Sequence, residues 1–306
     1  MSLLHCAVGQ NITGTIPTEL AVLPLLHSIA LALNDFTGTL PAVFASMRHL
    51  INLEVHENQL TGTFPGEYFQ TNALENLNIG DNQFTGTLST EIGLLTDLKG
   101  LQTYANFFSG TFPTEVSKLE FLSFSRNSDN IYSGTIPSEM GYLVKMEELW
   151  MHGNQFTGTI PTELGSMNTM VDMRLHLNKL TGSIPSGFYS FQYLFRLDLF
   201  SNYLTGTLQT EIGAFRGMQQ LRVSRNQFTG TFPTEIANLS SLRLGWFHSN
   251  KFVGSLPEEI CALRPIPLVI LQTDCFPDGN APNPCKCCTS CCNRDTEICT
   301  ILDDNA

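Results

Sequence analysis

The sequence predicts an α/β repeat solenoid, a coil with one short strand in every turn and a parallel sheet along one side. Two observations lead to this prediction: a 24-residue repeat that returns eleven times, and a period-2 apolar pattern at the same place in each copy. A third is composition, since 42% hydrophobic and 14% charged residues supply a continuous core and too little charge for a disordered chain. A single copy cannot bury both its faces, so its apolar side chains must stack on those of the neighbouring copies.

Glycine marks the repeat most clearly. It recurs inside a Thr-Gly-Thr-like triplet, where we expect it to supply a tight bend or a close contact between coils. A large apolar residue stands two positions before and two positions after each glycine, and proline follows three positions after it in nine of the eleven copies. The glycines are Gly14, Gly38, Gly62, Gly86, Gly110, Gly134, Gly158, Gly182, Gly206, Gly230 and Gly254.

Each predicted strand lies just upstream of an asparagine, as Leu53 and Val55 lie before Asn58. The spacing apolar, any, apolar is the period of a strand. The asparagine amide can bond backbone groups of its own and the adjacent coil, which would otherwise be buried without partners. Threonine or serine followed by glutamate comes after the proline, as at Thr162 and Glu163, and predicts a short helical turn on the other side of the coil.

The motif Leu-x-x-Asn-x-Leu-Thr-Gly-x-Ile-Pro, from Leu175 to Pro185, resembles plant-type leucine-rich repeats over roughly residues 10 to 275. The resemblance implies a right-handed leucine-rich-repeat solenoid, with a concave parallel β-sheet of short strands and short helical or 3-10 turns on the convex side. The Cys-Cys-Thr-x-Cys-Cys stretch from Cys287 to Cys292 is similar to the tails of diatom and algal leucine-rich-repeat proteins. We expect a truncated first repeat at residues 1–13, the array at 14–256, and a cysteine-rich cap and tail at 257–306.

The resemblance implies recognition of a protein, peptide or glycan on the concave face, as in receptor-like and inhibitor-like proteins. Stacking brings together no nucleophile, base and orienting group, and the chain lacks a Gly-rich phosphate loop, so we predict neither an enzyme nor a cofactor. The net charge of -12 opposes a nucleic-acid partner. No apolar run approaches the ~18 residues of a membrane span. The first ten residues hold no secretory signal, so we expect a start truncated upstream, with a possible membrane anchor there.

Residues at the same position in successive copies form a column along the predicted sheet, and two such columns predict the binding face. The residues between and just after the core positions of a strand point to solvent, and both tryptophans and four of the seven histidines fall there. Exposed aromatic residues with arginine are typical of interface hot spots and sugar platforms. The alternative is that these positions tolerate any residue and that aromatic side chains merely stack on one another. The predicted ligand-binding residues are His56, Tyr104, Trp150, His152, Arg174, His176, Phe200, Arg222, Arg225, Trp246 and His248.

Three further patterns carry weaker predictions. His152 and His176 share a column in consecutive copies and could share a metal if a third ligand joined them, although a solvated pair is the favoured interpretation. The copy from Leu122 to Asn127 fits the strand motif three residues early, which predicts a small bulge. The threonine columns beside the glycines suggest ice binding or a structural role in a cell wall as an alternative function, against which the expected twist argues.

Cysteine is crowded at the end of the chain, with eight of nine residues in the last 46. This favours an extracellular or cell-surface protein, secreted or membrane-associated. We expect disulfides, with Cys261 paired to Cys275, and keep zinc or copper binding by the clustered cysteines as a second alternative function. In the cap, Asp274 is expected to take the place of the asparagine. Asn11 and Asn238 fit the glycosylation pattern, and Asn238 would lie on the convex side.

Overall fold

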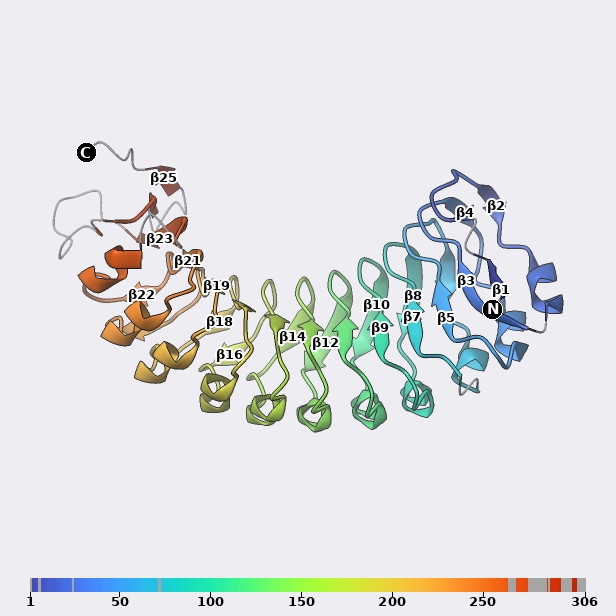
Figure 1. The fold of residues 1–306 in the computed structure, drawn as a ribbon, viewed down its shortest axis with the longest axis horizontal. Helices are drawn as coiled ribbons and strands as arrows, with labels where there is room; N and C mark the ends of the chain where they lie inside the picture. Colours follow the sequence, from blue (N-terminus) through green and yellow to red (C-terminus); the bar gives the residue numbers. More distant parts are fainter. Residues whose placement is uncertain are drawn as a thin grey trace. The chain divides into compact units, whose positions relative to one another are not determined.

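The structure, a computed structural model, describes residues 2–4, 7–23, 25–70, 73–263, 268–274, 285, 287–292 and 299–301. The chain divides into two compact units, Met1–Phe156 and Thr157–Ala306, and each is described by itself. Each unit is a stack of coils, in which a strand, a second short strand and a 3-10 turn follow one another (Figure 1). This is the leucine-rich-repeat solenoid that the sequence predicts.

A parallel sheet runs along one side of the first unit, in the order β1-β3-β5-β7-β9-β11-β13. From β3 onward the strands pair with an offset of 24 residues, so that Leu53 lies opposite Leu77 and Leu77 opposite Leu101. We call the outward surface of this sheet the strand face of the unit. The strands are β1 (Ser2–Leu4), β3 (Leu26–Ala30), β5 (Asn52–Glu54), β7 (Asn76–Asn78), β9 (Gly100–Gln102), β11 (Phe124–Arg126) and β13 (Glu148–Trp150).

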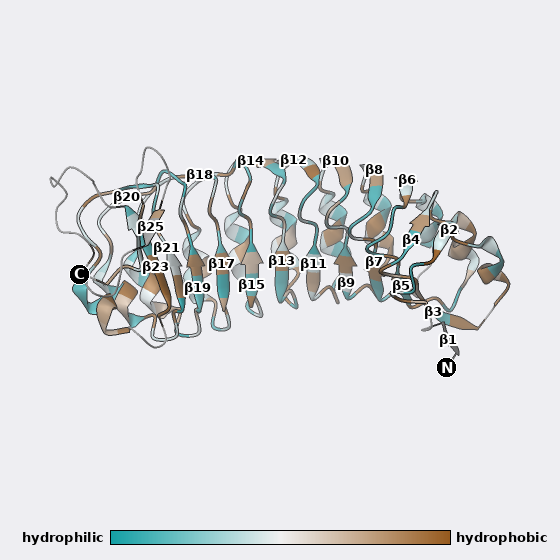
Figure 2. Cartoon of the chain, turned by 90° about the horizontal axis from the view of Figure 1, so that it is seen from above, coloured by the Kyte–Doolittle hydropathy of each residue, from teal (hydrophilic) through white to brown (hydrophobic). Residues whose placement is uncertain are grey.

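The second unit has its own row of main-sheet strands, in the order β15-β17-β19-β21-β23-β24-β25, and its outward surface is the strand face of that unit (Figure 2). The pairing is parallel from β15 to β21, again with an offset of 24 residues, and becomes antiparallel only between β24 and β25. The strands are β15 (Asp172–Arg174), β17 (Arg196–Asp198), β19 (Gln220–Arg222), β21 (Leu244–Trp246), β23 (Ile270–Asp274), β24 (Ser290–Cys292) and β25 (Cys299–Ile301).

Shorter strands pass through the Thr-Gly-Thr triplets. In the first unit β2 pairs with β4, and β6, β8, β10 and β12 form one parallel sheet; in the second, β16 pairs with β18 and β20 with β22. β14 lies where the two units divide. The strands are β2 (Thr13–Thr15), β4 (Asp35–Thr37), β6 (Thr61–Thr63), β8 (Gln83–Thr87), β10 (Phe107–Thr111), β12 (Ile131–Thr135), β14 (Gln155–Thr157), β16 (Thr181–Gly182), β18 (Tyr203–Leu204), β20 (Thr229–Gly230) and β22 (Lys251–Phe252).

The predicted helical turns are 3-10 turns and form the turn face of each unit. Proline precedes most of them in an extended conformation, and at Ser89 the hydroxyl caps the turn by accepting a hydrogen bond from the backbone N of Glu91. Among the described residues no helix is long and apolar enough to span a membrane. The turns are η1 (Thr18–Val22), η2 (Ala42–Ser46), η3 (Gly66–Gln70), η4 (Thr90–Leu94), η5 (Thr114–Lys118), η6 (Ser138–Tyr142), η7 (Thr162–Ser166), η8 (Ser186–Ser190), η9 (Thr210–Ala214), η10 (Thr234–Asn238) and η11 (Glu258–Leu263).

The asparagine column has the predicted role. Asn82 is buried, its Oδ1 accepts a hydrogen bond from the backbone N of Leu60, and its Nδ2 donates to the carbonyl oxygens of Val55, Ile79 and Gly80. Asparagines of other coils make equivalent bonds. Each one therefore joins two coils through backbone groups that would otherwise be buried unpaired.

The predicted bulge is wrong. β11 continues the register without interruption, with Phe124 opposite Gly100 and Arg126 opposite Gln102. Phe124 is half-buried on the strand face because Gly100 has no side chain beneath it, and a Cβ there would collide with the Phe124 ring. Two polar residues occupy the core positions instead, and they bond each other and the coil before: Asn127 Nδ2 donates to Ser125 Oγ, and Thr103 Oγ1 donates to Asn127 Oδ1.

The predicted disulfide between Cys261 and Cys275 is also wrong. Cys261 is bonded to Cys287, with Cα atoms 5.4 Å apart, because β24 pairs with β23 and brings the tail back beside η11. Cys275 lies outside the described residues. The other described pairs are Cys285–Cys288 and Cys292–Cys299, and Cys291 is disulfide-bonded as well.

Asp274 closes the regular part of the array differently from an asparagine. Its carboxylate accepts hydrogen bonds from the backbone N atoms of Ser249, at 2.6 Å, and Asn250, at 3.3 Å. In earlier coils such groups bond carbonyl oxygens of the next coil, as Arg225 N bonds His248 O. The Asp274 carboxylate thus accepts hydrogen bonds from backbone groups that main-chain carbonyls satisfy in earlier coils.

Candidate functional site

The strand face of each unit is a packed layer of side chains, not the fully solvated surface that the sequence suggests. Trp150 and Trp246 are half-buried, while His176 and His248 are buried and Asp198 is only 1% exposed. The cause is the strand spacing of ~4.8 Å, which brings side chains of one column into contact, so that large ones cover small ones.

In the second unit an arginine and three rings pack together. The guanidinium carbon of Arg222 lies 4.6 Å from the centre of the Trp246 ring. The Phe200 ring meets the same indole edge-on at 5.8 Å and stacks on His176 at 4.2 Å. Such cation-π and aromatic contacts fix the rings in place, with Phe200 and Trp246 half-buried and His176 buried. Four of the predicted residues therefore form one cluster.

Charged side chains of both signs lie beside this cluster. Arg174 makes a bidentate pair with Asp172, and Arg222 Nη1 lies 3.2 Å from Asp198 Oδ2. Arg196 Nη1 lies 3.9 Å from Asp172 Oδ2. Three guanidinium groups therefore face two carboxylates. The sequence pattern selected Arg174 and Arg222 but missed Arg196 and Asp172, which precede the first core position of their strands.

Asp198 is the most perturbed acid of this face. Burial raises its pKa from 3.8 to about 6, although Arg222, Arg196 and Arg174 oppose the shift. Its Oδ1 atom has no hydrogen-bond partner among the described residues, and neither has Trp246 Nε1. A buried acceptor and a buried donor without partners are costly to the folded state.

The first unit carries a similar arrangement that the sequence pattern missed. Arg126 lies over the Trp150 ring with its guanidinium carbon 4.4 Å from the ring centre. Its guanidinium donates two hydrogen bonds to Glu148 Oε2 and one to Gln102 Oε1. The sequence pattern did not select Arg126, because the strand motif of its copy was predicted to lie three residues early relative to the 24-residue repeat. The 24-residue spacing to Trp150 is the signal that would have found it.

The remaining predicted residues are spread more widely. His56 is half-buried, and the ring of Tyr104 lies over Gly80 with a pKa raised chiefly by burial and then by Glu57. Arg225 is exposed, with a left-handed φ of 54°. The glycosylation candidates Asn11 and Asn238 are both exposed.

His152 and His176, for which the sequence favours a solvated pair over a shared metal, belong to different units, and each has its own surroundings. His152 Nε2 lies 3.6 Å from Asp129 Oδ2 in the first unit. His176 stacks on Phe200 in the second.

The threonine columns before and after the glycines are exposed, but side chains of both columns contact a neighbouring coil. Thr61 and Thr85 donate their hydroxyl hydrogens to the carbonyl oxygens of Gly38 and Gly62. The methyl group of Thr87, in the other column, fills the space where a Cβ of Gly110 would lie. Glycine is needed there because its φ is 75° and its Cα meets this methyl.

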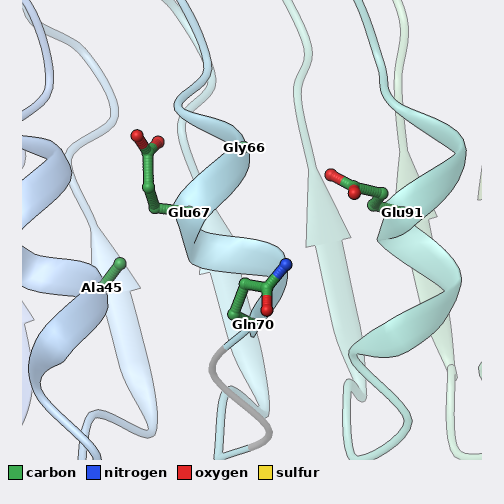
Figure 3. A pocket seen from close by; sticks show the side chains of 5 residues that line it. All are labelled: Ala45, Gly66, Glu67, Gln70 and Glu91. Atoms are coloured by element: carbon green, nitrogen blue, oxygen red, sulfur yellow. The ribbon is translucent and has the colours of Figure 1, made fainter.

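A shallow hollow on the turn face of the first unit is lined by Ala45, Gly66, Glu67, Gln70 and Glu91 (Figure 3). Its two acids belong to the recurring glutamate column, and Glu67 and Glu91 are exposed. Solvated acids of a helical turn account for the charge of this hollow.

Comparison with known proteins agrees with the fold. The Leucine Rich Repeat family pattern matches residues 145–167 and 217–239. A search of curated proteins gives no match. The solved structure of the plant peptide hormone receptor RGFR1 in complex with RGF2 is similar, with a TM-score of 0.70 and 25% identity over 86% of this chain and 50% of that one. This chain thus spans about half the length of that receptor chain.

Two other solved structures are similar. A leucine-rich-repeat protein of Leptospira interrogans has a TM-score of 0.64 and 26% identity, over 85% of this chain and 69% of its own. A plant ice-binding protein has a TM-score of 0.54 and 20% identity, over 80% and 71%, which shows the fold alone. The repeat pattern and the receptor structure together support a leucine-rich-repeat protein of the plant type.

Proposed function

We propose that the chain is an extracellular or cell-surface recognition protein that binds a peptide, protein or glycan through its strand faces and catalyses no reaction. The observation that carries the proposal is the arginine–tryptophan pair on each strand face, Arg126 with Trp150 and Arg222 with Trp246. Tryptophan and arginine are the residues most enriched at binding hot spots.

The physical advantage of these pairs is preorganisation. Trp246 is held by Arg222 and Phe200, and Arg222 is held in turn by Asp198 and Gln220. Ordering such side chains on binding costs roughly 0.5–1.5 kcal/mol each, a cost already met in the free protein. A ligand with both apolar and hydrogen-bonding groups, as peptides and sugars have, suits this surface.

Capture from arrays of secreted peptides and of glycans tests the proposal. The variant Trp246→Ala should weaken capture by roughly tenfold or more, since it removes a central anchor. Tyr193→Ala is the matched control, because Tyr193 belongs to the same unit, is 63% exposed and follows the turn η8. Trp150→Ala and Tyr142→Ala make the same comparison in the first unit. Unchanged capture by both tryptophan variants would end the proposal, provided that their circular dichroism matches the parent.

Export is part of the same proposal. It is supported by the disulfide bonding of all seven described cysteines, since such bonds persist in oxidising compartments. We also infer glycosylation at Asn11 and Asn238 and kinship of the Cys287 to Cys292 tail with diatom and algal proteins. Peptide mapping of protein secreted from a eukaryotic host would show the glycans, and their absence at both asparagines would remove that inference.

Ice binding is a second candidate, favoured by the exposed threonines on both sides of the glycines in β6 and β8 and after the glycines in β10 and β12. The use of these hydroxyls and methyls between coils opposes it. Purified protein that shaped ice crystals would establish this function, and rounded crystals without thermal hysteresis would exclude it.

A further inference from the structure

The second unit brings one histidine and two cysteines together where the array meets its tail. One ligand atom from each of His248, Cys292 and Cys299 lies within 4.8 Å of the others, and no other trio of histidine, cysteine or acidic residues in the described chain does so. His248 follows β21 by two residues, and Cys292 lies opposite Cys299 in the antiparallel pair of β24 and β25. His248 and Cys292 are buried, and Cys299 is half-buried.

Two cysteine sulfurs and one imidazole nitrogen form a ligand set typical of zinc sites, with a fourth position left for water. Cys292 and Cys299 are joined in a disulfide in this structure, and zinc binds thiolates rather than disulfide sulfurs. The redox state of this one bond therefore decides whether the ligand set exists. We propose that reduction of the Cys292–Cys299 disulfide creates a zinc site made of His248, Cys292 and Cys299.

The chemistry balances with a thiol as the reductant. Two thiol molecules cleave the sulfur–sulfur bond, give up two electrons and two protons, and leave as their own disulfide, while Cys292 and Cys299 become thiols. Zn²⁺ then replaces the two thiol protons and binds the neutral imidazole of His248, so each zinc bound releases two protons to solvent. Reoxidation by a small disulfide reverses both steps and expels the metal.

The geometry suits a tetrahedral ion. Zn–S bonds of about 2.3 Å and a Zn–N bond of about 2.0–2.1 Å separate the ligand atoms by roughly 3.5–3.8 Å. These separations lie inside the 4.8 Å within which the three atoms already fall. Opening the bond frees the Cys292 and Cys299 side chains to rotate, and we expect this rotation to bring the three atoms to the tetrahedral separations.

The surroundings also hold the histidine in position. Ser249 Oγ lies 3.1 Å from His248 Nδ1, and the backbone N of Ser249 is bound by Asp274 Oδ1. Contacts of this kind orient the imidazoles of metal sites. The proposal is independent of what the strand faces bind, because its readout is the metal itself.

The proposal is tested by titrating the full chain with zinc after reduction with a phosphine and in the absence of oxygen. A chromophoric chelator competes with the protein for the metal and reports how tightly each equivalent is bound. The other reduced cysteines also bind zinc, so the informative quantity is the difference between variants. His248→Ala should lose one equivalent of tight zinc or weaken it at least tenfold, while His49→Ala, a change at an exposed histidine, should not. His248→Cys supplies a thiolate at the same place and should restore the equivalent.

Cobalt gives an independent readout of the same site. Reduced parent protein should give the visible bands of a tetrahedral thiolate–imidazole complex that His248→Ala lacks, and the oxidised parent should give none. Equal zinc binding by His248→Ala and His49→Ala, or the same zinc equivalent in oxidised and reduced protein, would overturn the proposal. Near-identical thermal unfolding of the oxidised variants shows that the differences are not caused by misfolding.

Discussion

Arg222 and Trp246, one coil apart on β19 and β21, form a stacked pair with the guanidinium carbon 4.6 Å from the ring centre. In the first unit Arg126 and Trp150 repeat this relationship at 4.4 Å, again one coil apart. In both pairs an acidic side chain and a glutamine bond the same arginine. An indole, a guanidinium, a carboxylate and a glutamine amide thus occur together on both strand faces. This recurrence favours a shared binding role over a chance combination of side chains.

The raised pKa of Asp198 predicts a pH dependence of stability. Its pKa is 3.8 when unfolded and about 6 when folded, so the folded state binds this proton more tightly and loses stability as the pH rises between these values. The Asp198→Asn variant has no such proton. It should therefore gain about 3 kcal/mol relative to the parent between pH 3.5 and pH 7, measured by urea unfolding. A difference between the two proteins that does not change with pH would contradict the raised pKa.

The Gly182 position predicts a destabilisation with two causes. Its φ is 75°, and a Cβ would lie 2.8 Å from Thr159 Cγ2. Gly182→Ala should cost about 1–2 kcal/mol from the left-handed backbone alone. Adding Thr159→Ser should recover the part that comes from the methyl contact. Gly217→Ala is the control, since nothing lies within 4 Å of its Cβ position, and it should be neutral or slightly stabilising.

The asparagine column predicts a larger loss of stability on mutation. Asn106 is buried, accepts a hydrogen bond from Phe84 N and donates to the carbonyls of Ile79, Thr103 and Tyr104. Asn106→Ala leaves these groups unpaired and should cost about 3 kcal/mol in chemical denaturation. Asn168→Ala, a change at an exposed asparagine, is the control. If Asn106→Ala lowers the free energy of unfolding no more than Asn168→Ala does, the asparagine column does not stabilise the fold as described.

The tail predicts a specific set of linked peptides. Proteolysis without reduction, followed by mass spectrometry, should yield a fragment that joins Cys261 to Cys287. A fragment joining Cys261 to Cys275 would restore the pairing expected from sequence and contradict the structure.

The fold follows from the sequence because one period controls many residues at once. The glycine, asparagine and apolar columns each impose a local geometry, and eleven copies make errors in one coil unimportant for the whole. The coil of Ser125 and Asn127 shows the limit of this reasoning. Its core positions are polar, and the apolar side chain of Phe124 lies on the strand face over Gly100. A pattern that seeks apolar residues therefore shifted the phase and hid Arg126.

The candidate site is only partly readable from sequence for a similar reason. Column assignment places Trp150 and Trp246 on a strand face, but it cannot tell which side chains cover their neighbours. Asp198 was expected in solvent and is buried, because the larger side chains around it close over it. The partner of Cys261 depends on how the tail returns along β23, which the spacing of cysteines does not encode.

Hydroxyl-radical footprinting of the protein with a ligand selected from the arrays reports which face the ligand covers, and therefore tests whether the strand face of the second unit binds it. We expect Phe200 and Trp246 to lose reactivity on binding while Tyr193 keeps its reactivity. Protection of Tyr193, with unchanged labelling of Phe200 and Trp246, would contradict it.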